Sequence, residues 1–215
     1  MTIRFINYAS IKTDMSEKKI YNLFPDPIFR YKLENYEQIN EELLGYILDL
    51  QKKDSVGNNR SNRGGWHSPN FDLVNAGPPI NFINNFKDFL KQIITNEFGW
   101  EYIPNKQRIV AMWAIINKKS SYNVKHNHQN CYLSSAYYLK KPKNSGDITF
   151  FDPKEVKTYR FPEAKKNTDY SVEQITIKPE EGDLLIFPSY LYHEVGKNLT
   201  NEERIVVSFN IDIGY

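Results

Sequence analysis

Residues 204–212 read RIVVSFNID, and this stretch decides the fold class. Apolar and polar side chains alternate along most of it, with Ile205, Val207, Phe209 and Ile211 set against Arg204, Ser208, Asn210 and Asp212. In an extended strand such alternate residues point to opposite faces of a sheet. One face then packs on a core. The polar face either meets solvent, which is the commoner case, or lines a pocket.

Several further strand patterns, separated by turn residues, precede this one. They cover residues 108–116, 131–139, 147–151, 171–177 and 183–187. Before residue 105 the apolar residues recur with a helical period instead. Helices followed by many short strands predict an α+β protein with a β-sandwich or barrel, and strand composition alone does not choose between these.

Two amphipathic helices are expected in the first half of the chain. Apolar residues within 39–50 recur every three or four positions, and Asn35 with Gln38 has the form of a capping box at the start of that helix. The second helix should begin after the proline pair that opens with Pro78 and end at Gly99.

Extended and irregular segments surround these helices. Residues 20–33, which two prolines interrupt, are expected to form an edge strand or an extended segment. Residues 54–70 are dense in Gly, Asn, Ser and Arg and are expected to be loop. Residues 1–18 show no period and could form an N-terminal arm.

Composition fits an ordinary globular chain of 215 residues, 40% hydrophobic and 14% aromatic. A formal net charge of +2 argues against a nucleic-acid partner, and no apolar run reaches the length of a membrane span. Cys131 is the single cysteine, which excludes an internal disulfide and a cysteine-based zinc site. We expect one cytoplasmic domain over residues 1–215, with residues 1–104 supporting a β-core in residues 105–215.

Three of the four histidines form a candidate metal site. His126 and His128 lie two residues apart before a strand, so both imidazoles share a face of extended chain. His193 follows the buried-strand pattern of residues 182–188. Imidazole binds Fe, Zn, Cu and Ni, and a three-ligand site keeps positions open for substrate, oxygen or water. A histidine pair also occurs by chance in surface loops, so the surroundings decide.

The polar face of residues 204–212 adds a second feature. Arg204 lies eleven residues after His193, and a guanidinium there could bind a dicarboxylate through paired hydrogen bonds. Ser208, on the same face, would add a donor.

These motifs resemble the 2-oxoglutarate/Fe(II) oxygenases, in particular their prolyl-4-hydroxylase-like branch. In chain order they are His126-Asn127-His128, Tyr137-Tyr138-Leu139, Gly146-Asp147-Ile148, Phe187-Pro188 with His193, and Arg204. Arg63-Gly64-Gly65-Trp66-His67-Ser68 is similar to a stretch that accompanies a later His-x-His in a group of bacterial and phage oxygenases. The resemblance is specific over residues 105–212 and looser over 20–100.

The resemblance implies a double-stranded β-helix, a jelly-roll or cupin-like barrel, with N-terminal flanking helices. It implies Fe(II) bound by His126, His128 and His193. It implies 2-oxoglutarate bound by Arg204, Tyr138 and Ser208. Contacts to the oxygen site or the cosubstrate would come from Asn210 and Ser134. The implied reaction is oxidation, by default hydroxylation, of a small-molecule or peptidyl substrate, with release of succinate and CO2. Neither the substrate nor the oligomeric state follows from the resemblance.

His128 departs from the family pattern, which usually has Asp or Glu there. Three neutral ligands would leave an Fe(II) site one charge unit more positive, which could strengthen binding of the anionic cosubstrate. Alternatively, His128 swings away and leaves two protein ligands.

Two segments are expected at the entrance to the site. Residues 54–70 would form a substrate lid that includes Arg63, Trp66 and His67. Trp66 would stack on the substrate, or would instead pack on the barrel while His67 caps a turn. Residues 152–170 would form the other wall.

Three other functions fit parts of the sequence. A cupin-type metalloenzyme can use three histidines without 2-oxoglutarate, but it gives Arg204 and Tyr138 no function. A jelly-roll binding module needs no redox metal. A zinc hydrolase also accepts three histidine ligands.

Overall fold

The computed structural model describes residues 20, 24–103, 106–154 and 162–214. The helices are α1 (Tyr36–Lys53) and α2 (Pro78–Gln92), and a π-helical segment, η1 (Ile93–Glu97), extends α2. None of the described helices is long and apolar enough to cross a membrane. The N-terminal arm expected over residues 1–18 lies outside the described residues.

The strands are short except for three long ones in the centre. They are β1 (Phe29–Lys32), β2 (Asn62–Arg63), β3 (Trp66–His67), β4 (Gln107–Asn117), β5 (Tyr122–His126), β6 (Leu133–Lys140), β7 (Ile148–Phe151), β8 (Gln174–Ile177), β9 (Asp183–Pro188), β10 (His193–Val195) and β11 (Arg204–Ile213).

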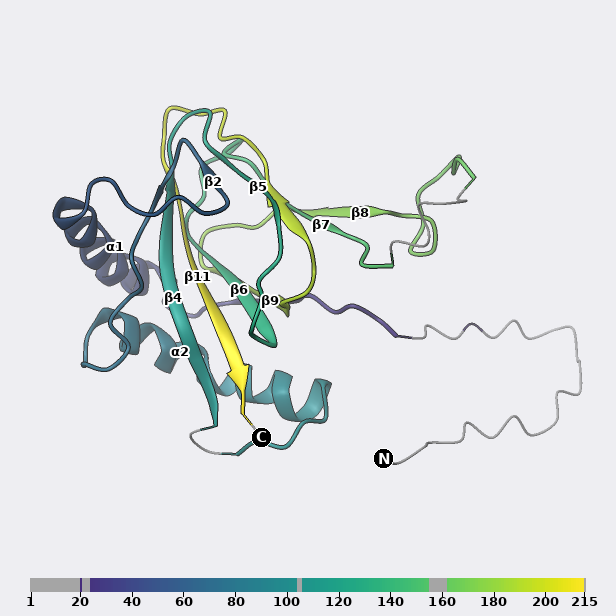
Figure 1. Ribbon diagram of the computed structural model, residues 1–215, viewed down its shortest axis with the longest axis horizontal. Coiled ribbons are helices and arrows are strands. Elements are labelled where there is room, and N and C mark those ends of the chain that lie inside the picture. Colours follow the sequence, from purple (N-terminus) through teal and green to yellow (C-terminus); the bar gives the residue numbers. More distant parts are fainter. Residues whose placement is uncertain (1–19, 21–23, 104–105, 155–161, 215) are drawn as a thin grey trace, which may run out of the picture.

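These strands form two antiparallel sheets (Figure 1). The larger sheet has the order β1-β9-β6-β11-β4-β3, and the smaller has the order β2-β5-β10-β7-β8. The helices α1 and α2 pack on one face of the larger sheet, and the smaller sheet lies on its other face. The fold is therefore α+β, a double-stranded β-helix with N-terminal helices, as the sequence predicts.

Strand β11 connects the two interiors of the molecule. Its apolar face, which includes Ile205, Val207 and Phe209, belongs to the main hydrophobic core, where Phe209 stacks on Phe86 of α2 with ring centroids 4.8 Å apart. Its other face, with Arg204 and Ser208, lines a cavity between the sheets. The predicted alternation is confirmed, and the polar face lines a pocket rather than bulk solvent.

The capping box expected at the start of α1 is wrong. Asn35 adopts a left-handed conformation with φ 53°, and its side chain makes no capping hydrogen bond. An N-cap needs extended backbone to direct its side chain at the first turn, and this conformation, which Asn tolerates, does not provide it. The Gln38 side chain instead contacts Glu42 one turn along the helix. The helix itself is confirmed.

The segment 54–70 is more structured than a loop. It contains β2, which pairs with β5, and β3, which pairs with β4. Trp66 is only 6% exposed, lies in the main core, and donates from Nε1 to the Asp54 carbonyl at 2.7 Å. Of the two roles considered for Trp66, packing on the barrel is therefore the one observed. Burial of this large apolar ring stabilises the folded protein more than partial exposure at a lid would.

Substitutions at two glycines test how local backbone geometry contributes to the stability of the fold. Gly182 has φ +81°, and a Cβ there would overlap the Tyr36 ring, whereas Gly45 in α1 has open space around it. We expect Gly182→Ala to lower the free energy of unfolding by about 1–3 kcal/mol, because strain and overlap add. Gly45→Ala should raise it by about 0.5–1 kcal/mol, because alanine favours helix. Urea unfolding measures both, and equal effects would contradict this account.

Candidate metal centre and cosubstrate pocket

The three predicted histidines meet at one point of the barrel. His126 ends β5 and His193 begins β10, and the two residues are paired across these strands. Their ring centroids are 4.3 Å apart, and each is 5.3 Å from the ring of His128. One nitrogen from each ring can be chosen so that all three lie within 4.8 Å of one another. Among the described residues, no carboxylate joins this group.

Hydrogen bonds orient each imidazole through Nδ1. The Nδ1 atom of His126 lies 2.7 Å from the Val124 carbonyl, and that of His193 lies 3.0 Å from the Leu191 carbonyl. The Nδ1 atom of His128 lies 2.7 Å from Oδ1 of Asn210. All three partners are acceptors, so each Nδ1 carries the proton and each Nε2 keeps its lone pair for a metal.

Burial keeps these imidazoles neutral. Loss of hydration lowers the pKa of His126, and it lowers the pKa of His128 to about 4. Loss of hydration, together with the neighbouring His126 and His128, holds the pKa of His193 well below 6.5. A metal ligand must be deprotonated, so the three rings can coordinate a cation at neutral pH without first losing protons.

A second layer of side chains fixes His128, the unusual member of the set. Ser134 donates to the same Asn210 oxygen at 3.1 Å, and Trp113 stacks on the His128 ring with centroids 5.6 Å apart. His128 therefore has a bonding partner and a packing partner that both hold it beside the other two rings. Ser134, an expected cosubstrate contact, lies behind Asn210 in this arrangement.

A cavity of about 600 Å³ opens beside the histidines. Its walls come from both sheets, and it extends from the metal centre to Arg204. The expected cosubstrate residues Tyr138 and Ser208 also line it, together with Asn210. The structure thus brings the predicted metal ligands together with Arg204, Tyr138 and Ser208 in one cavity.

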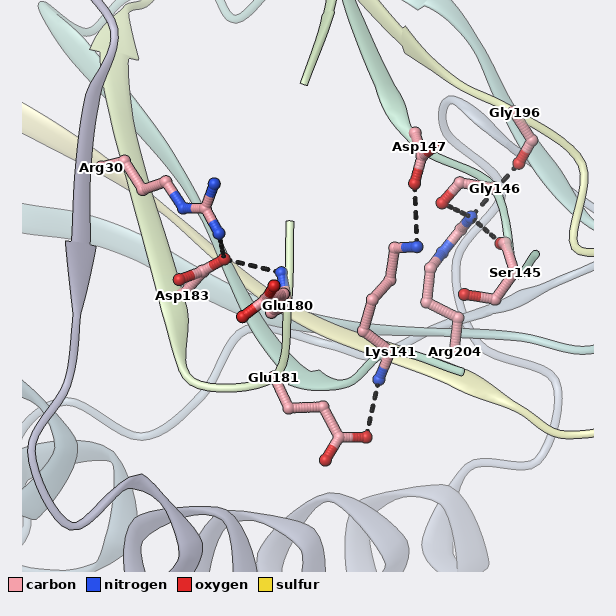
Figure 2. Close-up of polar contacts among 10 residues, drawn as sticks. All are labelled: Arg30, Lys141, Ser145, Gly146, Asp147, Glu180, Glu181, Asp183, Gly196 and Arg204. Atoms are coloured by element: carbon pink, nitrogen blue, oxygen red, sulfur yellow. Dashed lines mark hydrogen bonds and ion pairs between the residues drawn. The ribbon is translucent and has the colours of Figure 1, made fainter. Parts of the chain in front are cut away.

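Arg204 is a buried cation held by backbone carbonyls (Figure 2). Its side chain is 1% exposed, and Nη1 donates to the carbonyls of Ser145, Gly146 and Gly196. Nη2 is buried and has no partner within the described part of the chain. The neighbouring carboxylate, that of Asp147, pairs with Lys141 at 2.9 Å. Burial lowers the pKa of Arg204 to about 10, so the guanidinium stays charged at neutral pH.

Gly146 makes this cradle possible. Its φ is +89°, and an added Cβ would overlap the Gly196 carbonyl and lie 2.6 Å from Arg204 Nη1. Only glycine allows the backbone to approach the guanidinium this closely in that conformation. The glycine of the Gly146-Asp147-Ile148 motif therefore allows backbone carbonyls to hold the Arg204 guanidinium.

Tyr138 provides a second donor on the same side. The residue is 1% exposed, and burial raises the pKa of its hydroxyl above the usual 10. The hydroxyl therefore keeps its proton. Tyr137 faces the opposite way, and its hydroxyl donates to Oδ1 of Asn40 at 2.6 Å.

The three residues expected in a lid lie in three different environments. Arg63 is exposed, does not line the cavity, and donates to the carbonyls of Arg60 and Asn62. Trp66 is in the core. His67 does line the cavity, and it stacks on Trp113 with ring centroids 5.7 Å apart. The expected wall at residues 152–170 lies partly outside the described residues, and its described residues do not line this cavity.

Sequence reasoning did not single out two of the large lining residues. Trp113 and Arg60 both line the cavity. Trp113 is paired with Ser208 across β4 and β11, so the polar face of β11 together with its register identifies it. Arg60 sits in the Gly- and Asn-rich segment, where no period predicts direction.

Comparison with known proteins finds a family model that matches the second half of the chain. Residues 111–210 match the family model described as "Putative 2OG-Fe(II) oxygenase". The matched segment, which contains the three histidines, Arg204 and Tyr138, is therefore similar to this family of 2-oxoglutarate/Fe(II)-dependent oxygenases. Fe(II) and 2-oxoglutarate are the cofactors of the family. No curated protein sequence matches the chain.

Solved structures share the fold at low sequence identity. A prolyl-4-hydroxylase from Pseudomonas putida is 13% identical with a TM-score of 0.62, over 87% of this chain and 92% of that one. The α-ketoglutarate-dependent epimerase SnoN from nogalamycin biosynthesis is 12% identical with a TM-score of 0.61, over 87% and 76%. A prolyl hydroxylase from Trichoplax adhaerens is 15% identical with a TM-score of 0.59, over 87% and 84%.

The residues present fit both cofactors. Three imidazoles with protonated Nδ1 atoms offer three Nε2 donors, and imidazole is a suitable ligand for iron. The unpartnered Nη2 of a buried guanidinium and the protonated Tyr138 hydroxyl offer donors for a carboxylate in the same cavity.

The contact between Asn210 and His128 predicts a measurable effect on metal affinity. Asn210→Ala should weaken Fe(II) binding about 10- to 100-fold, because loss of a partner that orients a ligand has an effect of that size. Asn127→Ala is the matched control, since Asn127 lines the cavity but makes no hydrogen bond to a ligand ring within the described structure. Competition with a chromogenic chelator measures both affinities. Equal affinities in the two variants would show that Asn210 does not hold His128.

The buried neutral histidines also predict how the metal-free protein responds to acid. A pKa below 6.5 in the folded state means that the unfolded chain binds more protons between pH 6.5 and about 4. The contribution of these neutral histidines to the free energy of unfolding is then complete above pH 6.5. On acidification it falls by about 1.4 kcal/mol per pH unit for each such histidine. Urea unfolding in chelator between pH 7 and 5 measures this slope. His128→Asn should reduce the slope, and an unchanged slope would contradict the assignment.

Proposed function

We propose that the protein is a dioxygenase that uses Fe(II) and 2-oxoglutarate to hydroxylate a small-molecule or peptidyl substrate, with release of succinate and CO2. The observation that carries the proposal is that one cavity contains both a group of three histidines and a buried arginine. Three imidazole donors converge at one end, and a buried guanidinium with an unpartnered nitrogen lies at the other.

The metal would be held by His126, His128 and His193. When bound, Fe(II) with 2-oxoglutarate supplies the activation of oxygen that allows an unreactive C–H bond to be oxidised. Three protein ligands leave coordination positions free for the cosubstrate and oxygen. The second-layer bonds through Nδ1 would hold the three rings in the orientation that a metal ligand needs.

Arg204 would bind the distal carboxylate of 2-oxoglutarate through Nη2. Its three carbonyl contacts fix Nη1, so the guanidinium is already oriented before the cosubstrate arrives. Tyr138 and Ser208 would donate to the same carboxylate. Anchoring one end of the cosubstrate directs its other end toward the histidines, which removes the entropy cost of that alignment from the reaction.

Apolar side chains between the two ends limit water. Ile148, Val195 and Val206 line the cavity, with small Ala136 among them. These walls keep the dielectric low, which strengthens the hydrogen bonds that Arg204 and Tyr138 make to an anion. A small residue at position 136 leaves space for the cosubstrate.

The buried cation Arg204 favours the proposed oxygenase over the cupin-type alternative, a metalloenzyme that does not use 2-oxoglutarate. That reading needs the three histidines but leaves Arg204 and Tyr138 without a ligand in the cavity. A guanidinium out of water with an unmet donor is costly, and a dicarboxylate cosubstrate offsets that cost. Succinate release from 2-oxoglutarate distinguishes the two enzymes directly.

Two neighbouring tyrosines provide the test. The Fe(II) protein should release succinate from 2-oxoglutarate in the presence of oxygen. Tyr138→Phe should raise the KM for 2-oxoglutarate about tenfold, because a buried hydrogen bond to a charged group contributes about 1.5 kcal/mol or more. Tyr137→Phe is the control and should leave that KM unchanged, because its hydroxyl bonds Asn40 on the other face.

Arg204→Met should have a larger effect, about 100-fold on the same KM, since the charge is lost as well. Far-ultraviolet circular dichroism checks that this variant folds. The proposal fails if the iron-loaded wild-type protein releases no succinate, or if Tyr137→Phe and Tyr138→Phe change the KM equally.

A further inference from the structure

The charges that line the cavity are all of one sign. In the described part of the chain, its lining includes Arg60 and Arg204 and no Asp or Glu. The remaining polar lining consists of amides, hydroxyls and neutral imidazoles. Arg204 is assigned to the cosubstrate above, which leaves Arg60 as a second cation with no function.

Arg60 lies next to β5, the strand that ends at the metal-site residue His126. It directly precedes Ser61, whose carbonyl accepts from the Val124 amide of β5, two residues before His126. Arg204, in contrast, is paired with Asn117 at the far end of β4. The two guanidinium groups therefore come from different segments of the cavity wall, one from β11 and one from the segment before β2.

The Arg60 guanidinium is available to a ligand. The residue is exposed, and its side chain makes no hydrogen bond or ion pair with any residue that the structure describes. Only its backbone is fixed, because its amide donates to Oδ1 of Asn62 at 2.9 Å. Burial is the main cause of the lowered pKa of the His67 ring, and the positive charge of Arg60 lowers that pKa further.

Flat aromatic rings lie between Arg60 and the metal ligands. His67 stacks on Trp113 at an interplanar angle of 8°, and Trp113 stacks on His128 at 30°. Trp113 is partly exposed to the cavity. This row of rings offers a surface on which the body of a substrate can pack next to the metal centre.

We propose that the primary substrate is a small anion whose carboxylate or phosphate binds Arg60 while its body packs on Trp113. The inference rests on the proposed function and adds the chemical class of the substrate. A cationic site without neighbouring carboxylates attracts anions and repels cations, and low-dielectric walls strengthen that selection. A guanidinium also matches the planar geometry of both anionic groups.

Matched pairs of compounds test the charge requirement. The probes are free amino acids against their carboxamides, and nucleoside monophosphates against the parent nucleosides. Binding to the Zn(II)- and 2-oxoglutarate-loaded protein is measured by ligand-observed NMR, and stimulation of succinate release is measured with the Fe(II) enzyme. At least one anionic probe should bind and stimulate, and its neutral partner should do neither. The two series separate a carboxylate from a phosphate.

Neighbouring arginines provide the variant and its control. Arg60→Gln should weaken binding of the active anionic probe tenfold or more, because a charge-assisted contact is lost. Arg60→Lys should recover part of it. Arg63→Gln should bind the probe like the wild type, because Arg63 is exposed but does not line the cavity.

The inference is overturned if neutral partners bind as well as the anions, if no anionic probe binds, or if Arg60→Gln and Arg63→Gln behave alike. Failure of the proposed function is a separate result, because it appears as absent succinate release by the wild-type enzyme without any probe. Probe binding to the metal-free protein still reports on Arg60 in that case.

Discussion

The buried positive charge of Arg204 is the constraint on which the site depends. Moving a guanidinium out of water costs several kcal/mol, and carbonyl dipoles on Nη1 offset only part of that cost. The second nitrogen, Nη2, is buried without a partner in the described structure. An anion that bonds Nη2 therefore stabilises the folded protein as it binds. The same constraint explains Gly146, since no other residue lets the backbone approach the guanidinium this closely.

Strand β11 shows why so much of the fold can be predicted from sequence. Its apolar residues pack against the helices, and its polar residues carry the cosubstrate site on the other face. A register slip of one residue would exchange the two faces and bury Arg204 in the main core. Because the strand has to satisfy both environments, its sequence alternates clearly. The pattern indicates the sheet, the core and the direction of Arg204 together.

Most of the features that sequence reasoning missed depend on partners distant in the chain, and the capping box is a local exception. The capping box at Asn35 fails because the turn after β1 imposes a left-handed backbone there. The short strands β5 and β10 have too few residues to show a period, although they place His126 and His193 side by side. The bond from Asn210 to His128 spans 82 positions and follows from the packing of β11 beside the histidines. Local patterns contain none of this information.

The replacement of the usual carboxylate ligand by His128 and the lining of the cavity have the same electrostatic consequence. A carboxylate ligand would leave bound Fe(II) with one net positive charge, whereas three neutral imidazoles leave it with two. The two negative charges of 2-oxoglutarate balance the metal, so the charges of Arg204 and Arg60 remain in a cavity whose described lining has no acid. Positive charges that share one cavity repel each other. A site with this excess is stabilised by a further anion, and the exposed Arg60 lies where that anion would meet the metal centre.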